Sequence, residues 1–340
     1  MTVPFLDLRS AHAELRDHID EAHHRVLDSG RFLLGPETEA FETEFAAYCG
    51  ATHCVTVGSG LDALTLALTA IGVGPGDEVI VPSHTFIATW LAVSTTGARP
   101  VPVEPEPSGF GLDPAQVEAA VTTRTRGILP VHLYGHPVDL APIRALAERH
   151  GLFVVEDAAQ AHGARYRHNL IGSGPATAAF SFYPGKNLGA LGDGGAVVTS
   201  DAALAHRVRL LRNYGSPVKY RHDLRGGNSR IDEYRAAVLR VKLAVLDTWN
   251  SRRRTVAGRY RHELSGIDVR ALSPGMRLQL GDEAVIALVK LRTGCDQLHT
   301  VDARFPDEGQ GRIGWMCRVE RSGEVRVGDA ASVLAETVEV

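Results

Sequence analysis

One lysine stands in the stretch Ser181-Phe182-Tyr183-Pro184-Gly185-Lys186-Asn187-Leu188-Gly189, between two apolar segments of the chain. The run 178–182 predicts a buried strand that ends at Pro184 and Gly185, and residues 195–199 predict the next strand. A lysine on a short loop between core strands is partly removed from water, so its pKa falls and part of it is neutral amine. The neutral amine condenses with aldehydes, whereas a solvated turn lysine without a chemical role is the alternative for this pattern.

The rest of the first 250 residues alternates between short apolar runs and helical periodicity. Further strands are expected at residues 53–57, 79–81, 101–103, 127–131 and 152–156. Helices are expected at 15–27, 37–48, 61–71, 114–121, 139–150, 202–211 and 234–246, and another is expected to start within 82–90, with Phe86 in its first turn. This alternation with short loops predicts the α/β class, with a mostly parallel sheet between layers of helices.

Four features lie where predicted strands exit the sheet: Gly58-Ser59-Gly60, Phe86, Asp157 and Lys186. Ligands of parallel α/β sheets bind beyond the carboxyl ends of the strands, so we expect one ligand to contact all four. The glycine turn leads into a helix whose free amides and dipole favour an anion, although a plain βα turn uses the same residues. Asp157 leaves an apolar strand and needs a cationic partner, unless it caps the helix that follows.

The composition is that of an ordinary globular protein, with 44% hydrophobic and 22% charged residues among 340. A net charge of −4 gives no reason to expect nucleic acid or an anionic membrane as a partner. No signal-peptide pattern is visible, and no apolar run reaches the length of a membrane span. The four cysteines are too scattered for a disulfide framework or a zinc site, so a reducing cytoplasm is the expected location.

Several motifs, taken together, resemble the DegT/DnrJ/EryC1/StrS family of pyridoxal-phosphate-dependent sugar aminotransferases, which aminate nucleotide-linked keto-sugars. These motifs are Val3-Pro4-Phe5-Leu6-Asp7-Leu8, Ser29-Gly30, Gly35-Pro36, Gly60-Leu61-Asp62-Ala63-Leu64, Asp157-Ala158-Ala159-Gln160, Ser181 to Gly189, and Asn228-Ser229-Arg230. One such motif is a weak signal, whereas several in the family's order are specific. The resemblance covers residues 3–268 and implies the aspartate-aminotransferase type of fold, with pyridoxal 5'-phosphate as the cofactor.

By this resemblance, Lys186 and Asp157 are the catalytic residues. Lys186 forms the covalent link to the cofactor and, once substrate displaces it, carries a proton between the cofactor carbon and the sugar carbon. Asp157 faces the pyridine nitrogen of the cofactor. Opposite charges about 4 Å apart at an effective dielectric near 20 interact by roughly 4 kcal/mol, or about three pK units. That interaction keeps the ring nitrogen protonated at neutral pH, which makes the ring an electron sink.

The remaining matched positions imply cofactor ligands. Phe86 matches the aromatic residue that stacks on the ring, and Gln160 matches the residue near the ring hydroxyl. The matched phosphate ligands are Ser181 and the amides of Gly60 and Leu61. Asn228 matches a further phosphate ligand that the family supplies from the neighbouring subunit, so the resemblance implies a homodimer.

The substrate follows from a closer resemblance. Residues 85–93 and 211–216 look most like members that aminate C-3 of a dTDP-3-keto-6-deoxyhexose, with glutamate as amino donor, although members acting on C-4 share the core motifs. Such amino sugars belong to antibiotics or cell-surface polysaccharides. A family branch that removes a hydroxyl has histidine at the position of Lys186, so lysine favours amino transfer. Another enzyme of the same fold type, such as an aldolase, is disfavoured by Asn228-Ser229-Arg230.

The C-terminal sequence leaves the family pattern and has no His-Tyr-Pro substrate loop. The expected domains are 1–250, the large cofactor-binding domain; 251–270, the start of a truncated small domain; and 271–340, a fragment. The fragment resembles the later half of a MOSC domain, with Cys295 at that family's cysteine. Half a barrel leaves open strand edges, so a fusion or truncation product with a passive thiol is expected. The alternative to a working aminotransferase is therefore a relic that binds the cofactor, turns over poorly and acts as a binding or interaction protein.

Overall fold

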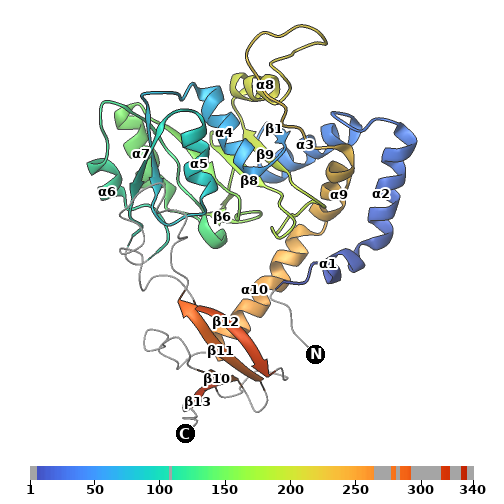
Figure 1. Ribbon diagram of the computed structural model, residues 1–340, viewed down its shortest axis with the longest axis vertical. Helices are drawn as coiled ribbons and strands as arrows, with labels where there is room; N and C mark the ends of the chain where they lie inside the picture. The colour runs from blue at the N-terminus through green and yellow to red at the C-terminus, as the bar shows by residue number, and fades with distance from the viewer. Residues whose placement is uncertain are drawn as a thin grey trace. The chain divides into compact units, whose positions relative to one another are not determined.

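The computed structural model describes residues 6–106, 109–263, 277–280, 284–291, 315–321 and 331–334 (Figure 1). Leu8–Asp247 form one compact unit, and the residues from Thr248 onward belong to a second unit. Every position that the sequence analysis assigned to the cofactor site lies in the first unit.

Helices and short strands alternate along the first unit. Its helices are α1 (Arg9–Glu14), α2 (Arg16–Ser29), α3 (Pro36–Cys49), α4 (Gly60–Ile71), α5 (Ala88–Thr95), α6 (Pro114–Ala119), η1 (Leu133–Gly135), α7 (Leu140–His150), α8 (Ala202–Leu211) and α9 (Glu233–Leu243). Its strands are β1 (His53–Val57), β2 (Glu78–Pro82), β3 (Arg99–Val103), β4 (Thr125–Ile128), β5 (Phe153–Asp157), β6 (Arg165–Tyr166), β7 (Asn169–Leu170), β8 (Thr177–Ser181) and β9 (Gly195–Thr199). Helix α10 (Leu246–Glu263) leads into the second unit.

A seven-stranded sheet in the order β1-β9-β8-β5-β4-β2-β3 is the centre of the first unit. The ladders from β8 through β5, β4 and β2 to β3 are parallel, whereas β9 pairs antiparallel with both β1 and β8. The mostly parallel α/β sheet predicted from the sequence is confirmed. Because of the register of β9, Gly195 lies opposite Val57 on one side and opposite Ser181 on the other.

Helices cover both faces of this sheet (Figure 1). Residues of α3 and α9 join Ala178 and Phe180 of β8 in one hydrophobic cluster. Helix α4 packs on the same strands, β8 and β9, without contributing to that cluster, so it covers the opposite face. Successive side chains of a strand point to opposite faces, and β8 is therefore buried on both.

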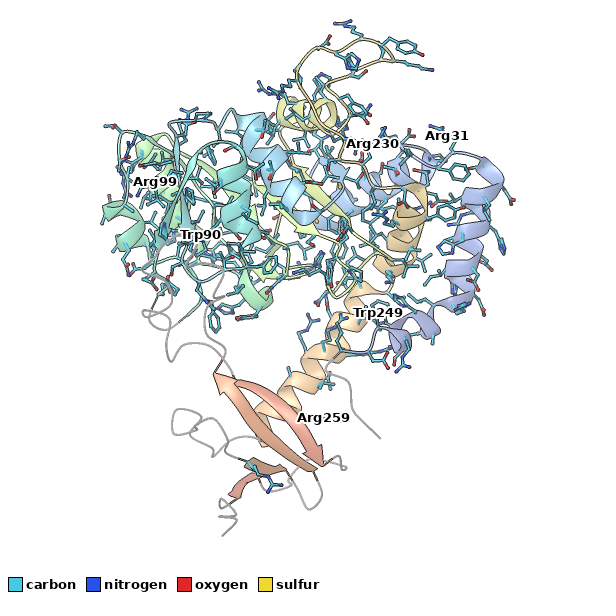
Figure 2. The ribbon with its side chains drawn as sticks, in the orientation of Figure 1. Arg31, Trp90, Arg99, Arg230, Trp249 and Arg259 are labelled. Atoms are coloured by element: carbon cyan, nitrogen blue, oxygen red, sulfur yellow. The ribbon has the colours of Figure 1, made fainter. Side chains whose placement is uncertain are left out.

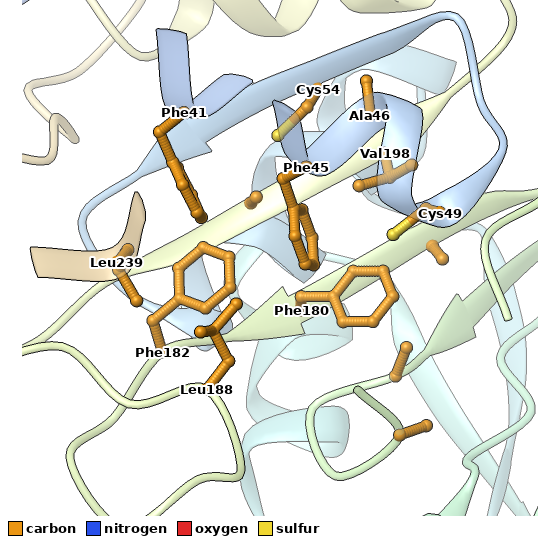
Figure 3. Packing of buried hydrophobic residues seen from close by; sticks show 14 of the residues in the cluster. Phe41, Phe45, Ala46, Cys49, Cys54, Phe180, Phe182, Leu188, Val198 and Leu239 are labelled. Atoms are coloured by element: carbon orange, nitrogen blue, oxygen red, sulfur yellow. The ribbon is translucent and has the colours of Figure 1, made fainter. Parts of the chain in front are cut away.

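Aromatic rings fill the core between α3 and β8 (Figure 3). Phe182 makes edge contacts with Phe41 and Phe45, whose centroids both lie 5.3 Å from its own. Leu188 is fully buried in the same cluster, and Leu239 joins it from α9. The residues on either side of the Pro184–Asn187 turn are therefore anchored in the core.

The helix ends follow from local sequence signals. Ser59, Asp139, Asp201 and Asp232 cap four helices by accepting hydrogen bonds from first-turn amides, which otherwise lack acceptors. An unusual cap begins α3, where the buried carboxylate of Glu233 accepts from the N–H groups of Gly35, Glu37 and Thr38. This contact joins residues almost two hundred positions apart, so it was not visible in the local sequence.

Three expected boundaries differ from the structure. Phe86 does not lie in the first turn of a helix: Thr89 N–H donates to Phe86 C=O in a tight four-residue turn, and α5 begins only at Ala88. The strand expected at 127–131 ends at Ile128, although Val131 still forms an isolated parallel bridge with Asp157 beyond Pro130. The helix expected to run to residue 246 also breaks, at a turn in which Val245 N–H bonds to Lys242 C=O.

The second unit contains an antiparallel sheet in the order β12-β11-β10-β13. Its strands are β10 (Arg277–Leu280), β11 (Ala284–Leu291), β12 (Trp315–Arg321) and β13 (Ala331–Leu334). Strands were expected in this part of the chain from its alternating apolar pattern. Cys295, to which the MOSC resemblance was tied, lies outside the described residues.

Candidate active site

Asp157 is the last residue of β5, and its carboxylate is almost fully buried, with 5% of the residue exposed. Its Oδ2 accepts a hydrogen bond from Thr89 Oγ1 at 2.8 Å, and its Oδ1 accepts from the N–H of Ala159 at 3.1 Å. Burial raises the pKa of Asp157, while these two donors and the charge of Lys186 act in the opposite direction. A buried carboxylate whose pKa stays raised despite its donors is a site that favours a further cation.

Lys186 lies on the loop that follows β8, the strand next to β5. The loop closes tightly, because Ala190 N–H donates to Phe182 C=O and Lys186 N–H donates to Tyr183 C=O, both at 2.8 Å. Desolvation lowers the pKa of the Lys186 amine, and the carboxylate of Asp157 partly opposes that shift. The two groups therefore act on each other electrostatically, and burial shifts the amine toward its neutral form.

The N-terminus of α4 lies directly against Ser181. A Cβ atom at Gly60 would stand 2.6 Å from Cβ of Ser181, and one at Gly195 would stand 2.3 Å from the carbonyl oxygen of Ser59. Only glycine at both positions permits this approach. The amides of Gly60 and Leu61 are the first of the helix and have no intrahelical acceptor, so helix dipole, amides and the Ser181 hydroxyl can bind one anion together.

The turn before α4 is also fixed by Ser229. The Ser229 hydroxyl donates to Asp62 Oδ2 at 2.8 Å and accepts from the N–H of Gly58 at 2.9 Å. The neighbouring Asn228 is exposed, and its Oδ1 accepts from Arg230 Nε at 2.9 Å. Within the described part of the chain, the Asn228 side chain is thus bonded to Arg230 and makes no hydrogen bond to Gly60 or Ser181.

The other two predicted cofactor ligands lie on loops at the carboxyl edge of the sheet. Phe86 is 69% exposed and precedes α5. Gln160 is half-buried, and its Oε1 accepts from the N–H of Tyr134 at 2.6 Å. The structure therefore brings together Lys186 with Asp157, and Gly60 with Ser181, whereas Phe86 and Gln160 take part in neither contact.

Sequence analysis missed Thr89, the residue that donates to Asp157. Thr89 is fully buried on α5, and its hydroxyl also lies 2.8 Å from that of Thr85. The following residue, Trp90, fixes the helix to the sheet by donating from Nε1 to Pro82 C=O at 3.0 Å (Figure 2). The available signal was a pair of threonines spaced i, i+4 around a helix start that is otherwise apolar.

These residues fit pyridoxal phosphate in three respects. They provide a half-buried amine for its aldehyde, a buried carboxylate for its ring nitrogen and a glycine-lined helix N-terminus for its phosphate. Among the residues that the structure describes, no group of three or more His, Cys, Asp or Glu side chains is arranged to hold a metal ion. No helix in that same part of the chain is both long and apolar enough to cross a membrane.

A sequence model of the DegT/DnrJ/EryC1/StrS aminotransferase family matches residues 13–300. This match extends past residue 268, where the sequence motifs had placed the end of the resemblance. The chain is 68% identical, over 267 residues, to the erythromycin biosynthesis sensory transduction protein EryC1 of Saccharopolyspora erythraea, which covers 78% of this chain and 73% of that protein. It is 65% identical over 265 residues to the dTDP-3-amino-3,4,6-trideoxy-alpha-D-glucose transaminase of Streptomyces venezuelae, covering 78% and 70%.

The fold is also that of a solved aminotransferase. The structure of S. venezuelae DesV in complex with a ketimine intermediate superimposes with a TM-score of 0.78 at 58% sequence identity. The superposition covers 89% of this chain and 81% of that one. The carboxyl edge described above is therefore the part of the molecule in which to look for transaminase chemistry.

Proposed function

Because the chain belongs to the DegT/DnrJ/EryC1/StrS aminotransferase family, we propose that it transfers an amino group from glutamate to C-3 of a dTDP-linked keto-deoxyhexose, using pyridoxal phosphate. The product would be an amino sugar of the kind built into antibiotics. The reaction is supported by the two relatives from erythromycin biosynthesis and from a dTDP-amino-sugar pathway. The observation that carries the proposal is the electrostatic pair of Lys186 and Asp157 beside the Gly60–Ser181 contact.

Pyridoxal phosphate, when bound, supplies an aldehyde that carries the amino group and a ring that takes up electrons. Lys186 Nζ would hold the cofactor and then move a proton between the two carbon atoms that exchange the amino group. Its lowered pKa suits this role, because a general base must be partly unprotonated at the working pH. Asp157 would keep a proton on the ring nitrogen, and Thr89 would hold that carboxylate in place.

The remaining residues would bind and orient. Ser181 and the amides of Gly60 and Leu61 would bind the phosphate, Phe86 would cover the ring face and Gln160 would stand near the ring hydroxyl. We propose that Asn228 completes the phosphate site of a second subunit in a homodimer. Two observations support this assignment: Asn228 is exposed, and Ser229 fixes its segment next to α4.

For the C-terminal part, we propose that residues 271–340 are a MOSC-like fragment without sulfur chemistry of its own. Its described strands form a sheet of only four short members, fewer than a closed barrel needs. Replacing Cys295 by serine should leave transamination unchanged, whereas a loss of activity would assign that thiol a role.

One spectroscopic experiment tests the main proposal. Purified protein is mixed with pyridoxal phosphate, the visible absorption of lysine-bound cofactor is recorded, and glutamate is then added. We expect the band to form and then to disappear with glutamate, and to return when a dTDP-3-keto-6-deoxyhexose is added. The Lys186→Ala variant should form no band.

The other outcomes are equally informative. A band that glutamate does not change would favour a cofactor-binding protein without turnover, and a wild type that forms no band would disprove the proposal. A band that returns with a 4-keto sugar and not with a 3-keto sugar would move the site of amination to C-4.

A further inference from the structure

A second lysine, Lys242 of α9, is buried almost completely, with 3% of the residue exposed. Its Nζ donates to the carbonyl oxygen of Gly189 at 2.6 Å and lies 3.0 Å from Nε2 of His12 on α1. Burial lowers its pKa to about 8, and no carboxylate of the described residues opposes that shift. Burying an amine without an anionic partner destabilises a fold, so the presence of a lysine at this buried position needs an explanation.

The acceptor of this bond ends the loop that carries Lys186. Gly189 is folded against the start of the same loop, since a Cβ atom there would stand 2.3 Å from the carbonyl oxygen of Pro184. Its neighbours Leu188 and Ala190 are fully buried. The Gly189 carbonyl therefore lies in a buried part of the chain, where an unpaired acceptor costs free energy, and Lys242 is the side chain that satisfies it.

Helix α9 holds this loop through two residues on one face. Leu239 packs in the cluster that contains Leu188 (Figure 3), and Lys242, three positions later, bonds to the next residue of the loop. The contact between Leu239 and Leu188 is apolar and non-directional, so small shifts of the loop do not break it. The hydrogen bond from Lys242, in contrast, fixes the position of the Gly189 carbonyl group. The pKa of Lys186 itself responds to desolvation and to the charge of Asp157, so the contact of Lys242 with the loop is one of position.

We propose that Lys242 is a positioning residue for the reaction: its bond to Gly189 C=O fixes the 183–189 turn so that the Lys186 amine stays opposite Asp157. The role of Lys186 rests on the proposed function, but the fixing of the turn does not. His12 takes part by accepting from Lys242 through a neutral ring, which connects α1 to the same loop.

Hydrogen exchange in the cofactor-free protein tests this proposal separately from catalysis. Lys242→Met keeps the length of the side chain and removes the donor, Lys242→Arg restores a donor, and Lys219→Met is the control at an exposed lysine. In Lys242→Met we expect exchange of peptides spanning 183–190 to accelerate about 10-fold, as for the loss of one hydrogen bond to a charged group. Affinity for pyridoxal phosphate should fall by a similar factor, with Lys242→Arg between this variant and wild type.

Two results would overturn the proposal. One is unchanged exchange at 183–190 in Lys242→Met with unchanged cofactor affinity. The other is an acceleration that is equal in β8, β9 and the loop, which would make Lys242 a general core residue. If wild type binds no cofactor at all, the proposed function fails, while exchange at the loop still decides whether Lys242 holds it.

Discussion

Two consecutive carboxylates at the end of β5 point to opposite faces of the sheet and have opposite electrostatic surroundings. Glu156 accepts from Arg144 at 2.8 Å and from His132 at 3.2 Å. Burial alone would raise its pKa, but these two donors hold the pKa below its ordinary value. Asp157, one position later, has a hydroxyl and one amide as donors, and burial raises its pKa.

The difference separates a structural carboxylate from a functional one. The ion pair of Glu156 is complete within the chain, since His132 also accepts from the N–H of Val138 at Nδ1 and so carries its proton on the nitrogen that faces Glu156. The charge of Asp157 is only partly compensated, which lowers stability but leaves the carboxylate able to bind a cation strongly. Active-site residues are expected on the side where compensation is incomplete.

Replacing Asp157 by asparagine should produce the largest effect on activity. The amide cannot hold a proton on the ring nitrogen of the cofactor, and the lost charge interaction corresponds to roughly 4 kcal/mol. We expect the transamination rate to fall about 10³-fold, as measured by steady-state kinetics. The cofactor-free variant should unfold in urea at the same or a higher concentration than wild type, because a buried neutral amide costs less than a buried carboxylate. A clear loss of stability would show that Asp157 is structural.

Replacing Glu156 by glutamine should give the converse pattern. The change leaves Arg144 and His132 facing a neutral group on the other side of the strand. Because the Arg144 side chain is 41% exposed and stays solvated, the cost is that of a lost hydrogen bond to a charged group, about 1.5 kcal/mol. We expect the urea midpoint to fall accordingly, while the rate of the folded variant changes by less than about threefold. A large fall in rate with unchanged stability would contradict the division between the two faces.

The positions of Asp157 and Lys186 could be predicted from the sequence, but the difference in hydrogen-bond partners between Glu156 and Asp157 could not. The strand, the exit position of Asp157 and the loop of Lys186 follow from local patterns, because apolar runs, glycine and proline act over a few residues. The family motifs then suggested the pairing of Asp157 with Lys186. The local pattern placed Glu156 inside the strand and Asp157 at its exit. It did not show that the two carboxylates have different electrostatic surroundings, because these depend on which residues each side chain meets.

The residues that were missed are those whose partners lie far away in the chain. Thr89 is 68 positions from Asp157, Lys242 is 53 positions from Gly189, and Glu233 is 198 positions from Gly35. Each pair depends on the packing of complete helices, which no window of the sequence contains. Phe86 was placed in a helix for a related reason: the turn before α5 is fixed by hydrogen bonds and not by residue type.

Replacing Thr89 by valine weakens only one of the donors to Asp157. The shape of the side chain is retained, while the hydrogen bond of 2.8 Å is lost and the pKa of Asp157 should rise further. We expect the rate at neutral pH to fall about 10-fold, as for the loss of a hydrogen bond to a charged group. The acid limb of the pH–rate profile should move to higher pH, because activity needs ionised Asp157. Thr89→Ser, which keeps the hydroxyl, should restore the profile; a profile that does not move in Thr89→Val would exclude this role.

The smallest effect is a difference in how the two carboxylates couple stability to pH in the cofactor-free protein. The pKa of Glu156 is about 4.5 in the unfolded chain and lower in the folded protein. The ionised carboxylate therefore stabilises the fold fully above pH 4.5, and this stabilisation is lost as the pH falls through the folded pKa. The pKa of Asp157 is about 3.8 in the unfolded chain and higher in the folded protein. As the pH falls, the folded protein therefore binds this proton before the unfolded chain does, and the free-energy cost of burying the charge disappears by about pH 3.8. Between pH 7 and pH 3, the difference in urea midpoint between wild type and variant should therefore change in opposite directions for Asp157→Asn and Glu156→Gln. As the pH falls, the urea midpoint of wild type should rise relative to that of Asp157→Asn. Below pH 4.5, the urea midpoint of wild type should fall toward that of Glu156→Gln. Parallel curves would mean that the two faces of the strand do not differ electrostatically, and the assignment of Asp157 to the cofactor would lose its physical basis.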